Sequence, residues 1–223
     1  MNSLRAFMPA LVNKKYFNYG GQGPLPDCSL EAIIHSWKTI QALGPFTNDV
    51  WPYVANETNK TRMVLAKLCG VSPRCLALTE NVTSGCSLPL WGLPFGTGDR
   101  ILLSDSEHPG VIANCYELAR RFGLYIDFMS IQKDKKTIFG GNSDNIVLDS
   151  LERNLQTKTR LVVISNLLWN TGEIMPIKAI SERLSCHKNR PYLLVDGAQS
   201  FGQISVEESA SSSDIFAFTG HKW

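Results

Sequence analysis

Side chains able to take part in catalysis gather in four short motifs of the 223-residue sequence. The motifs are TENVTSG (79–85), SEHPG (106–110), VDGAQSFG (195–202) and TGHKW (219–223). Their candidate site residues are Thr83, Ser84, His108, Asp196, Gln199, Thr219, His221 and Lys222. These types supply donors for an anion, a carboxylate, an aromatic base and a nucleophilic amine. The sequence therefore contains the groups that a cofactor-dependent reaction needs.

Each motif also has an ordinary structural interpretation. Thr83 could cap a helix that begins there. Asp196 followed by Gly197 is a common turn pair, and a single histidine is more often a hydrogen-bonding residue than a catalyst. The combination is more informative, because pyridoxal phosphate requires a phosphate cradle, a carboxylate, a stacking ring and a lysine. The motifs together predict a pyridoxal phosphate site.

Each group has a distinct role in such a site. Lys222 would form the imine (Schiff base) with the cofactor aldehyde and then move the proton at the substrate Cα atom. Asp196 would pair with the pyridine nitrogen, Gln199 would donate to the ring oxygen, and His108 would stack on the ring. The residues predicted to hold the phosphate are Thr83, Ser84, Thr219 and His221.

The elements that must position these residues are short apolar strands alternating with helices. The expected strands are Cys75–Leu78, Arg100–Ser104, Leu124–Met129, Arg160–Asn166, Tyr192–Asp196 and Asp214–Thr219. The expected helices are Thr83–Trp91, Pro109–Phe122, Asn145–Gln156 and Ile177–His187, after two earlier helices near 27–43 and 56–68. Strands that are apolar throughout indicate an α/β fold with a mainly parallel sheet and helices on both faces. Ligands bind at the carboxyl ends of such strands, where the motifs lie.

Composition and charge exclude several other classes. The net charge of +2 and the lack of a basic stripe give no support for a nucleic-acid partner. No apolar run approaches the roughly 18 to 20 residues that cross a bilayer, and the N-terminus lacks a signal-peptide pattern, so we expect a cytoplasmic protein without a membrane partner. The six cysteines show no metal-ligand spacing, which predicts reduced, mostly buried thiols and no metal.

A dehydrogenase-like nucleotide binder on a similar sheet is disfavoured. No phosphate loop of the G-x-x-x-x-G-K-[ST] type is present, and Pro26 stands where the third glycine of a dinucleotide fingerprint belongs. Such a protein would also leave Lys222 without a role.

In these four motifs, in their order and spacing, the sequence resembles the class V aminotransferase family of fold type I pyridoxal phosphate enzymes. The resemblance begins at Tyr16 and implies that residues 16–223 are a pyridoxal phosphate-binding large domain preceded by an N-terminal segment (1–15). It also implies a homodimer and an amino-acid substrate.

Three further segments resemble cysteine/cystine C-S lyases within this family: FNYGGQGPLP (17–26), LWGLPF (90–95) and LLWNTGEIMPI (167–177). The resemblance implies β-elimination from cysteine or cystine, giving pyruvate, ammonia and a sulfide or persulfide. Alternatives within the family are a cysteine desulfurase, an epimerase and an aminotransferase. A desulfurase needs a nucleophilic cysteine on a later loop, and none of the six cysteines corresponds to it.

Two departures from the family pattern qualify this expectation. Many desulfurases have an asparagine near the cofactor oxygen where this chain has Trp169, so the neighbouring Asn170 is predicted as the substrate-binding amide. The chain also ends one residue after Lys222, before the small C-terminal domain and the arginine that binds the substrate carboxylate. A catalytically inactive fragment is therefore a further alternative.

Overall fold

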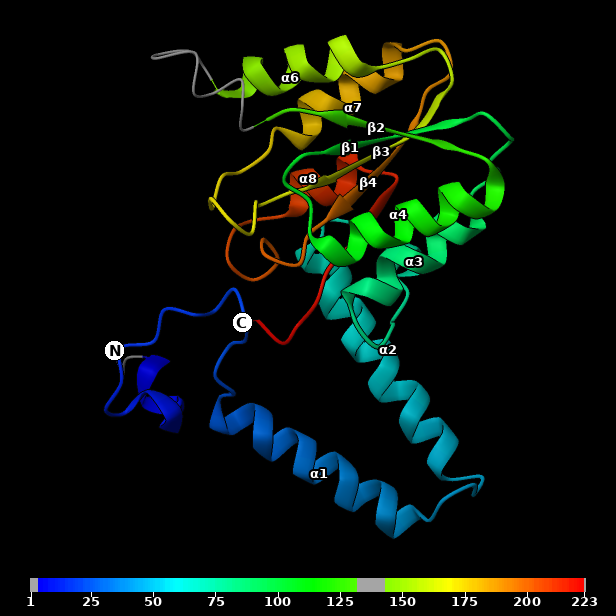
Figure 1. Cartoon of the computed structure of the whole chain (residues 1–223). Helices are drawn as coiled ribbons and strands as arrows, with labels where there is room; N and C mark the ends of the chain where they lie inside the picture. Colours follow the sequence, from blue (N-terminus) through cyan, green and yellow to red (C-terminus); the bar gives the residue numbers. More distant parts are fainter. Residues whose placement is uncertain (1–3, 132–142, 223) are drawn as a thin grey trace. The chain divides into compact units, whose positions relative to one another are not determined.

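Five parallel strands form one sheet in the structure, a computed structural model that describes residues 4–131 and 143–222 (Figure 1). They are β1 (Arg100–Ser104), β2 (Tyr125–Met129), β3 (Thr159–Ser165), β4 (Tyr192–Asp196) and β5 (Ile215–Ala217), arranged in the order β2-β1-β3-β4-β5. The strands β1, β3 and β4 are almost entirely buried, as expected for apolar strands covered on both faces. The predicted parallel α/β fold is confirmed.

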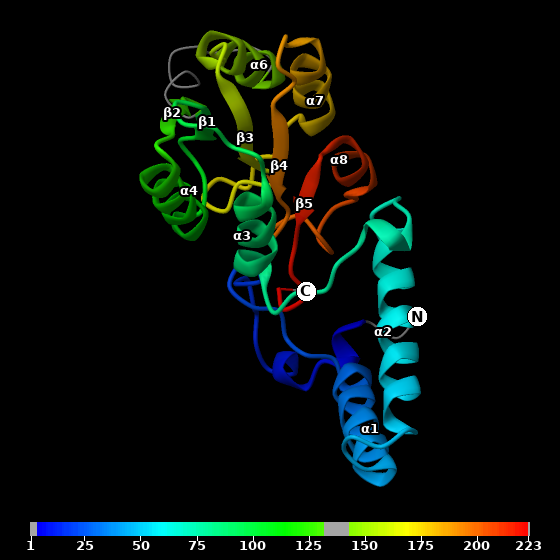
Figure 2. The same ribbon diagram turned by 90° about the vertical axis from the view of Figure 1, so that its right-hand side faces the viewer.

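Two helical layers cover the sheet, and Figure 2 shows them on its opposite faces. Helices α3 (Val82–Gly92) and α4 (Pro109–Phe122) pack on one face, where side chains such as Ile101 and Leu103 point. Helices α6 (Ser143–Asn154), α7 (Ile177–Cys186) and α8 (Glu207–Ser212) lie on the other face, toward which Leu102 points. The alternation of side chains along each strand thus builds two separate apolar cores.

The chain forms two compact units. One contains the sheet and its helices and comprises Leu68–Val71 and Leu78–Thr219. The other comprises Met1–Lys67, Ser72–Ala77 and Gly220–Trp223, of which the structure describes the residues from 4 to 222. We call them the sheet unit and the helical unit.

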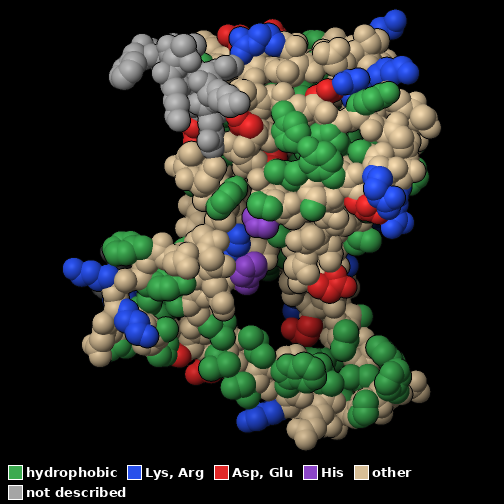
Figure 3. Space-filling model, viewed as in Figure 1, with side chains coloured by type: hydrophobic (Ala, Val, Ile, Leu, Met, Phe, Trp, Pro, Cys, Tyr) green, Lys and Arg blue, Asp and Glu red, His purple; other side chains and the backbone are tan. Residues whose placement is uncertain are grey.

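The helical unit contains short 3-10 turns and two long helices. The turns are η1 (Leu4–Phe7), η2 (Pro9–Leu11) and η3 (Pro73–Cys75), and the helices are α1 (Asp27–Leu43) and α2 (Val50–Leu68), whose last residue belongs to the sheet unit. All 17 residues of α1 stay at least partly exposed. Its apolar side chains Leu30, Ile33, Ile34 and Trp37 are among them. Hydrophobic side chains are correspondingly visible on the surface of this part of the chain in Figure 3.

Three expectations about the elements are corrected. The segment Cys75–Leu78 is not a strand: Pro73 begins a 3-10 turn, and the Leu76 carbonyl accepts a hydrogen bond from Arg62 Nε at 3.0 Å. Helix α2 begins six residues before the expected Asn56, and the short helix α8 was not expected. A run of four apolar residues is too short for periodicity to distinguish a strand from other buried segments.

The described parts of the chain contain no helix that is both long and apolar enough to cross a membrane. They also contain no group of three or more metal-ligating side chains. The six cysteines are free thiols, and three of them, Cys69, Cys86 and Cys115, are buried.

Candidate active site

The carboxyl end of β4 carries a buried carboxylate, Asp196, which is only 6% exposed. Its Oδ1 atom accepts a hydrogen bond from the Ala198 N–H at 2.9 Å. Gly197 follows and donates its N–H to the Ala217 carbonyl at 2.7 Å, which ties this turn to β5. Gln199 is half-buried in the same turn. The sequence VDGAQ thus places one acidic and one amide side chain directly after a core strand.

A second buried carboxyl group, that of Glu107, lies where β1 ends. Its Oε1 atom accepts hydrogen bonds from the Ser104 hydroxyl and from the Ser165 N–H at 3.0 Å, and its Oε2 atom accepts from the Ser165 hydroxyl at 2.8 Å. Burial raises the pKa of Glu107 to about 7, and the nearby charge of Asp196 adds to the increase. Sequence reasoning missed Glu107. The sequence feature that could have identified Glu107 is its position between a buried strand and the candidate residue His108.

His108 caps the N-terminus of α4. Its Nδ1 atom accepts a hydrogen bond from the Gly110 N–H at 3.2 Å, and Pro109 occupies the first helical position, where its missing N–H costs nothing. The imidazole is exposed and meets the Trp169 ring edge to face, with centroids 6.3 Å apart. This pairing brings together the loops that follow β1 and β3.

The start of α3 is capped by Asn81, and not by Thr83. The Asn81 Oδ1 atom accepts the Ser84 N–H at 2.9 Å. Two hydrogen bonds lower the pKa of Glu80. The larger effect comes from the backbone N–H of Glu80 and the smaller one from the Ser84 side chain. Thr83 is exposed in the first turn, where helix N–H groups have no partner within the helix. Its hydroxyl is therefore available to an anion at this positive helix end.

The loop after β3 holds the predicted Asn170 and an asparagine that sequence reasoning missed. The loop closes through a bridge between Leu167 and Ile174 and turns at Gly172, whose φ is +75°. Asn170 is exposed on it. Asn166, at the end of β3, is fully buried, and neither polar atom of its side chain has a partner among the residues that the structure describes. The sequence feature that could have identified Asn166 is its position at the end of a buried strand. Asp196 has a similar position as the last residue of β4.

Asn166 also lines a hollow of about 680 Å³ between the loop at Met175 and helices α7 and α8. Lys178 and Glu208, on those two helices, form an ion pair of 2.9 Å beside it.

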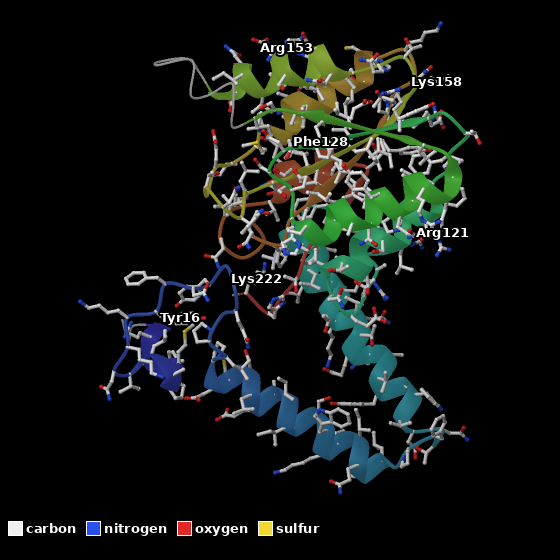
Figure 4. All side chains as sticks on the ribbon, in the orientation of Figure 1. Tyr16, Arg121, Phe128, Arg153, Lys158 and Lys222 are labelled. Carbon is white, nitrogen blue, oxygen red and sulfur yellow. The ribbon has the colours of Figure 1, made fainter. Side chains whose placement is uncertain are left out.

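The last motif divides between the two units. Thr219 is buried at the end of the sheet unit, two residues after β5. His221 and Lys222 belong to the helical unit, where the Gly23 N–H donates to the His221 carbonyl at 2.9 Å. Figure 4 shows Lys222 on the segment that follows β5, and Tyr16 on the N-terminal segment. Trp223 lies outside the described residues.

The residues of the sheet unit fit pyridoxal phosphate. Asp196 is a buried carboxylate suited to a protonated ring nitrogen, and the first turn of α3 suits a phosphate. Asn166 adds a buried amide whose hydrogen-bonding capacity is not used within the described residues. A buried polar group without a hydrogen-bond partner costs free energy. A polar ligand bound at the strand ends would supply the missing partner. A parallel α/β sheet with these groups at its carboxyl edge defines a cofactor-binding enzyme fold.

Comparisons with known proteins identify the family of this chain. A family model for class V aminotransferases matches residues 16–223. A probable cysteine desulfurase of Halalkalibacterium halodurans is 31% identical over 127 residues, which are 57% of this chain and 29% of that protein. A structure of the cystine C-S lyase C-DES with its product cysteine persulfide is 41% identical, with a TM-score of 0.87, and the match covers 97% of this chain and 55% of that one. A C-DES mutant with glycine covalently linked to its pyridoxal phosphate cofactor is 40% identical, with a TM-score of 0.88, over 98% and 56%.

The chain belongs to the class V aminotransferase family. The expected family and its fold are thereby confirmed, and one of the two C-DES structures carries the expected cofactor, pyridoxal phosphate. The matches cover 29% of the desulfurase and 55–56% of the C-DES chain, so this chain corresponds to only part of these relatives.

Proposed function

We propose that this chain binds pyridoxal phosphate and takes part in β-elimination that breaks the C-S bond of cysteine or cystine. The observation that carries the proposal is the buried carboxylate of Asp196 at the end of β4, in a chain 41% identical to a cystine C-S lyase. Bound pyridoxal phosphate supplies an electron sink for negative charge that develops at the substrate Cα atom. The residues of this chain then have to bind the cofactor and the substrate, orient them and transfer the proton.

In this proposal Lys222 holds the cofactor through its Nζ atom and moves the proton at the substrate Cα atom. Asp196 keeps the ring nitrogen protonated, and its burial strengthens that interaction because water does not screen it. Gln199 donates a hydrogen bond to the ring oxygen, and His108 stacks on the ring. The phosphate is held by Thr83, Ser84, Thr219 and His221, and Asn170 contacts the substrate.

The substrate class is a sulfur amino acid, and the expected products are pyruvate, ammonia and a sulfur species. A cysteine desulfurase is the second candidate, favoured by the relative from Halalkalibacterium halodurans. The two differ in their products, since a desulfurase releases alanine and retains a persulfide on a cysteine. The assembly is proposed to be a homodimer, which the exposed apolar side chains of α1 support, and a cytoplasmic location stays a prediction.

The first experiment is borohydride reduction of the purified protein with pyridoxal phosphate, followed by peptide mapping. We expect a pyridoxyl adduct on Lys222, and none at that peptide in the Lys222→Ala variant.

The second experiment is product analysis with cysteine and cystine. Pyruvate and ammonia support the lyase, and alanine with a bound persulfide supports the desulfurase. An intact protein that acquires no adduct would contradict the proposal and favour an inactive chain.

A further inference from the structure

Glu107 is a buried carboxyl group with no role in the proposed function. It is 4% exposed, and its three donors come from two different strand ends: Ser104 on β1, and the hydroxyl and backbone N–H of Ser165 on β3. Ser104 is itself held, because its Oγ atom accepts the Ser106 N–H at 3.2 Å. One carboxyl group therefore joins the turn at 104–107 to β3.

The turn that Glu107 fixes leads directly into His108. His108 is the N-cap of α4, so the position of its backbone depends on where the turn ends. On the other side, Ser165 pairs in register with Asp196, and the neighbouring Asn166 donates its N–H to the Asp196 carbonyl at 2.9 Å. A continuous series of hydrogen bonds and peptide bonds thus runs from His108 through Glu107 to Asp196.

The charge of Glu107 also acts on this region. The titratable groups that face it are Asp196 on β4, Cys86 on α3 and Cys115 on α4. Burial raises the pKa of both thiols, that of Cys115 to about 12, so they stay neutral near pH 7. Asp196 is then the charged group that interacts electrostatically with Glu107.

We propose that Glu107 is a positioning residue of this site, which fixes the His108 turn to β3 and, when ionised, adds a second negative charge behind Asp196. The inference rests on the proposed binding of pyridoxal phosphate. An ionised Glu107 favours a protonated cofactor ring held by Asp196, so cofactor affinity should gain from ionisation of Glu107.

The first test uses the protein without cofactor and does not depend on the proposed function. The carboxyl carbons of ¹³C-labelled glutamate are followed by NMR against pH, and the Glu107 resonance is assigned by its loss in Glu107→Gln. We expect a midpoint near neutrality that moves down in Asp196→Asn, where the neighbouring charge is removed. If Glu107→Gln does not fold, the Ser165→Ala variant, which removes one donor, assigns the resonance. A midpoint at the ordinary glutamate value, or one that Asp196→Asn leaves in place, overturns the proposal.

The second test compares pyridoxal phosphate affinity of the wild type and of Glu107→Gln between pH 6 and pH 8. Other effects of pH on cofactor binding are common to both proteins, so the ratio of their affinities isolates the effect of Glu107. We expect the ratio to rise in favour of the wild type by roughly threefold or more across this range. A ratio that is constant with pH means a purely structural role and overturns the proposal. The control is Asp105→Asn, an exposed carboxylate of the same turn, which should leave the wild-type profile unchanged.

If the wild type takes up no cofactor on Lys222, the proposed function fails, and the first test still reports on the coupling of Glu107 to Asp196. The two failures are therefore distinguishable.

Discussion

Gly197 lies directly against the ring of Phe216, and a Cβ atom at this position would be 2.5 Å from the Phe216 Cζ atom. The turn after Asp196 can approach β5 this closely only because Gly197 has no side chain. We expect Gly197→Ala to lower the free energy of unfolding by about 1–3 kcal/mol, as overpacking does in other cores. Urea denaturation measures the change. Gly92→Ala is the matched control, because a Cβ atom there meets nothing within 4 Å, and an equal loss in both variants would contradict the argument.

The cap of α3 can be separated from its anion-binding role. Asn81→Ala removes the acceptor for the Ser84 N–H and should cost about 1 kcal/mol of stability. Asn81→Asp keeps an acceptor, and its negative charge suits the helix N-terminus, so stability should be retained. The same charge repels a phosphate. Pyridoxal phosphate affinity should therefore fall several-fold, the size expected for repulsion between one pair of solvent-screened charges. Equal affinity in Asn81→Asp and the wild type would argue against a phosphate at this turn.

Asp196→Asn tests the electrostatic role of the buried carboxylate. The asparagine oxygen can still accept the Ala198 N–H, so the fold should be kept. The variant loses the charge that holds a protonated ring nitrogen, and we expect kcat for C-S cleavage to fall on the order of a hundredfold, the size of losing one preorganised electrostatic contact. Steady-state kinetics measures this loss. Asp149→Asn, an exposed carboxylate on α6, should leave kcat unchanged.

Glu107 should make stability depend on pH with a definite sign. Its pKa is raised from 4.5 to about 7 in the folded chain, so the folded state binds the proton more tightly than the unfolded state. The resulting stabilisation is fully present below about pH 4.5 and is lost as the pH rises through about 7. It amounts to about 3 kcal/mol at most, by the conversion of a pKa difference into free energy. Urea melts of the wild type relative to Glu107→Gln should show this loss, and parallel curves would contradict it.

The sequence was sufficient to predict the elements in which pattern and length agree. The strand Tyr192–Asp196 has the predicted bounds, because it is apolar, short and ended by Asp-Gly. The bounds of α4 were equally clear, since Pro109 opens the helix and Gly123 closes it in the left-handed conformation. The segment Cys75–Leu78 failed because four apolar residues do not reveal whether a neighbouring strand is present to receive their hydrogen bonds.

Candidate site residues could be chosen from the sequence only where a residue type suggests a chemical role. His108 and Asp196 were chosen because they follow core strands and fit one cofactor together with the other motifs, and their roles stay predictions. Glu107 and Asn166 could not, because their importance comes from burial and from hydrogen-bond partners on other strands. Ser165 is 58 residues away from Glu107 in the chain, and such a contact has no local signature.

Hydrogen exchange of the exposed helix α1 should reveal whether the protein associates with another protein surface. A helix of 17 residues whose side chains all remain at least partly exposed gains little from packing, and isolated helices of this length are only marginally stable in water. Its amide hydrogens should therefore exchange rapidly in a single chain and slowly once another protein surface covers Ile33 and Trp37. Hydrogen exchange along α1 thus works as a built-in reporter of association.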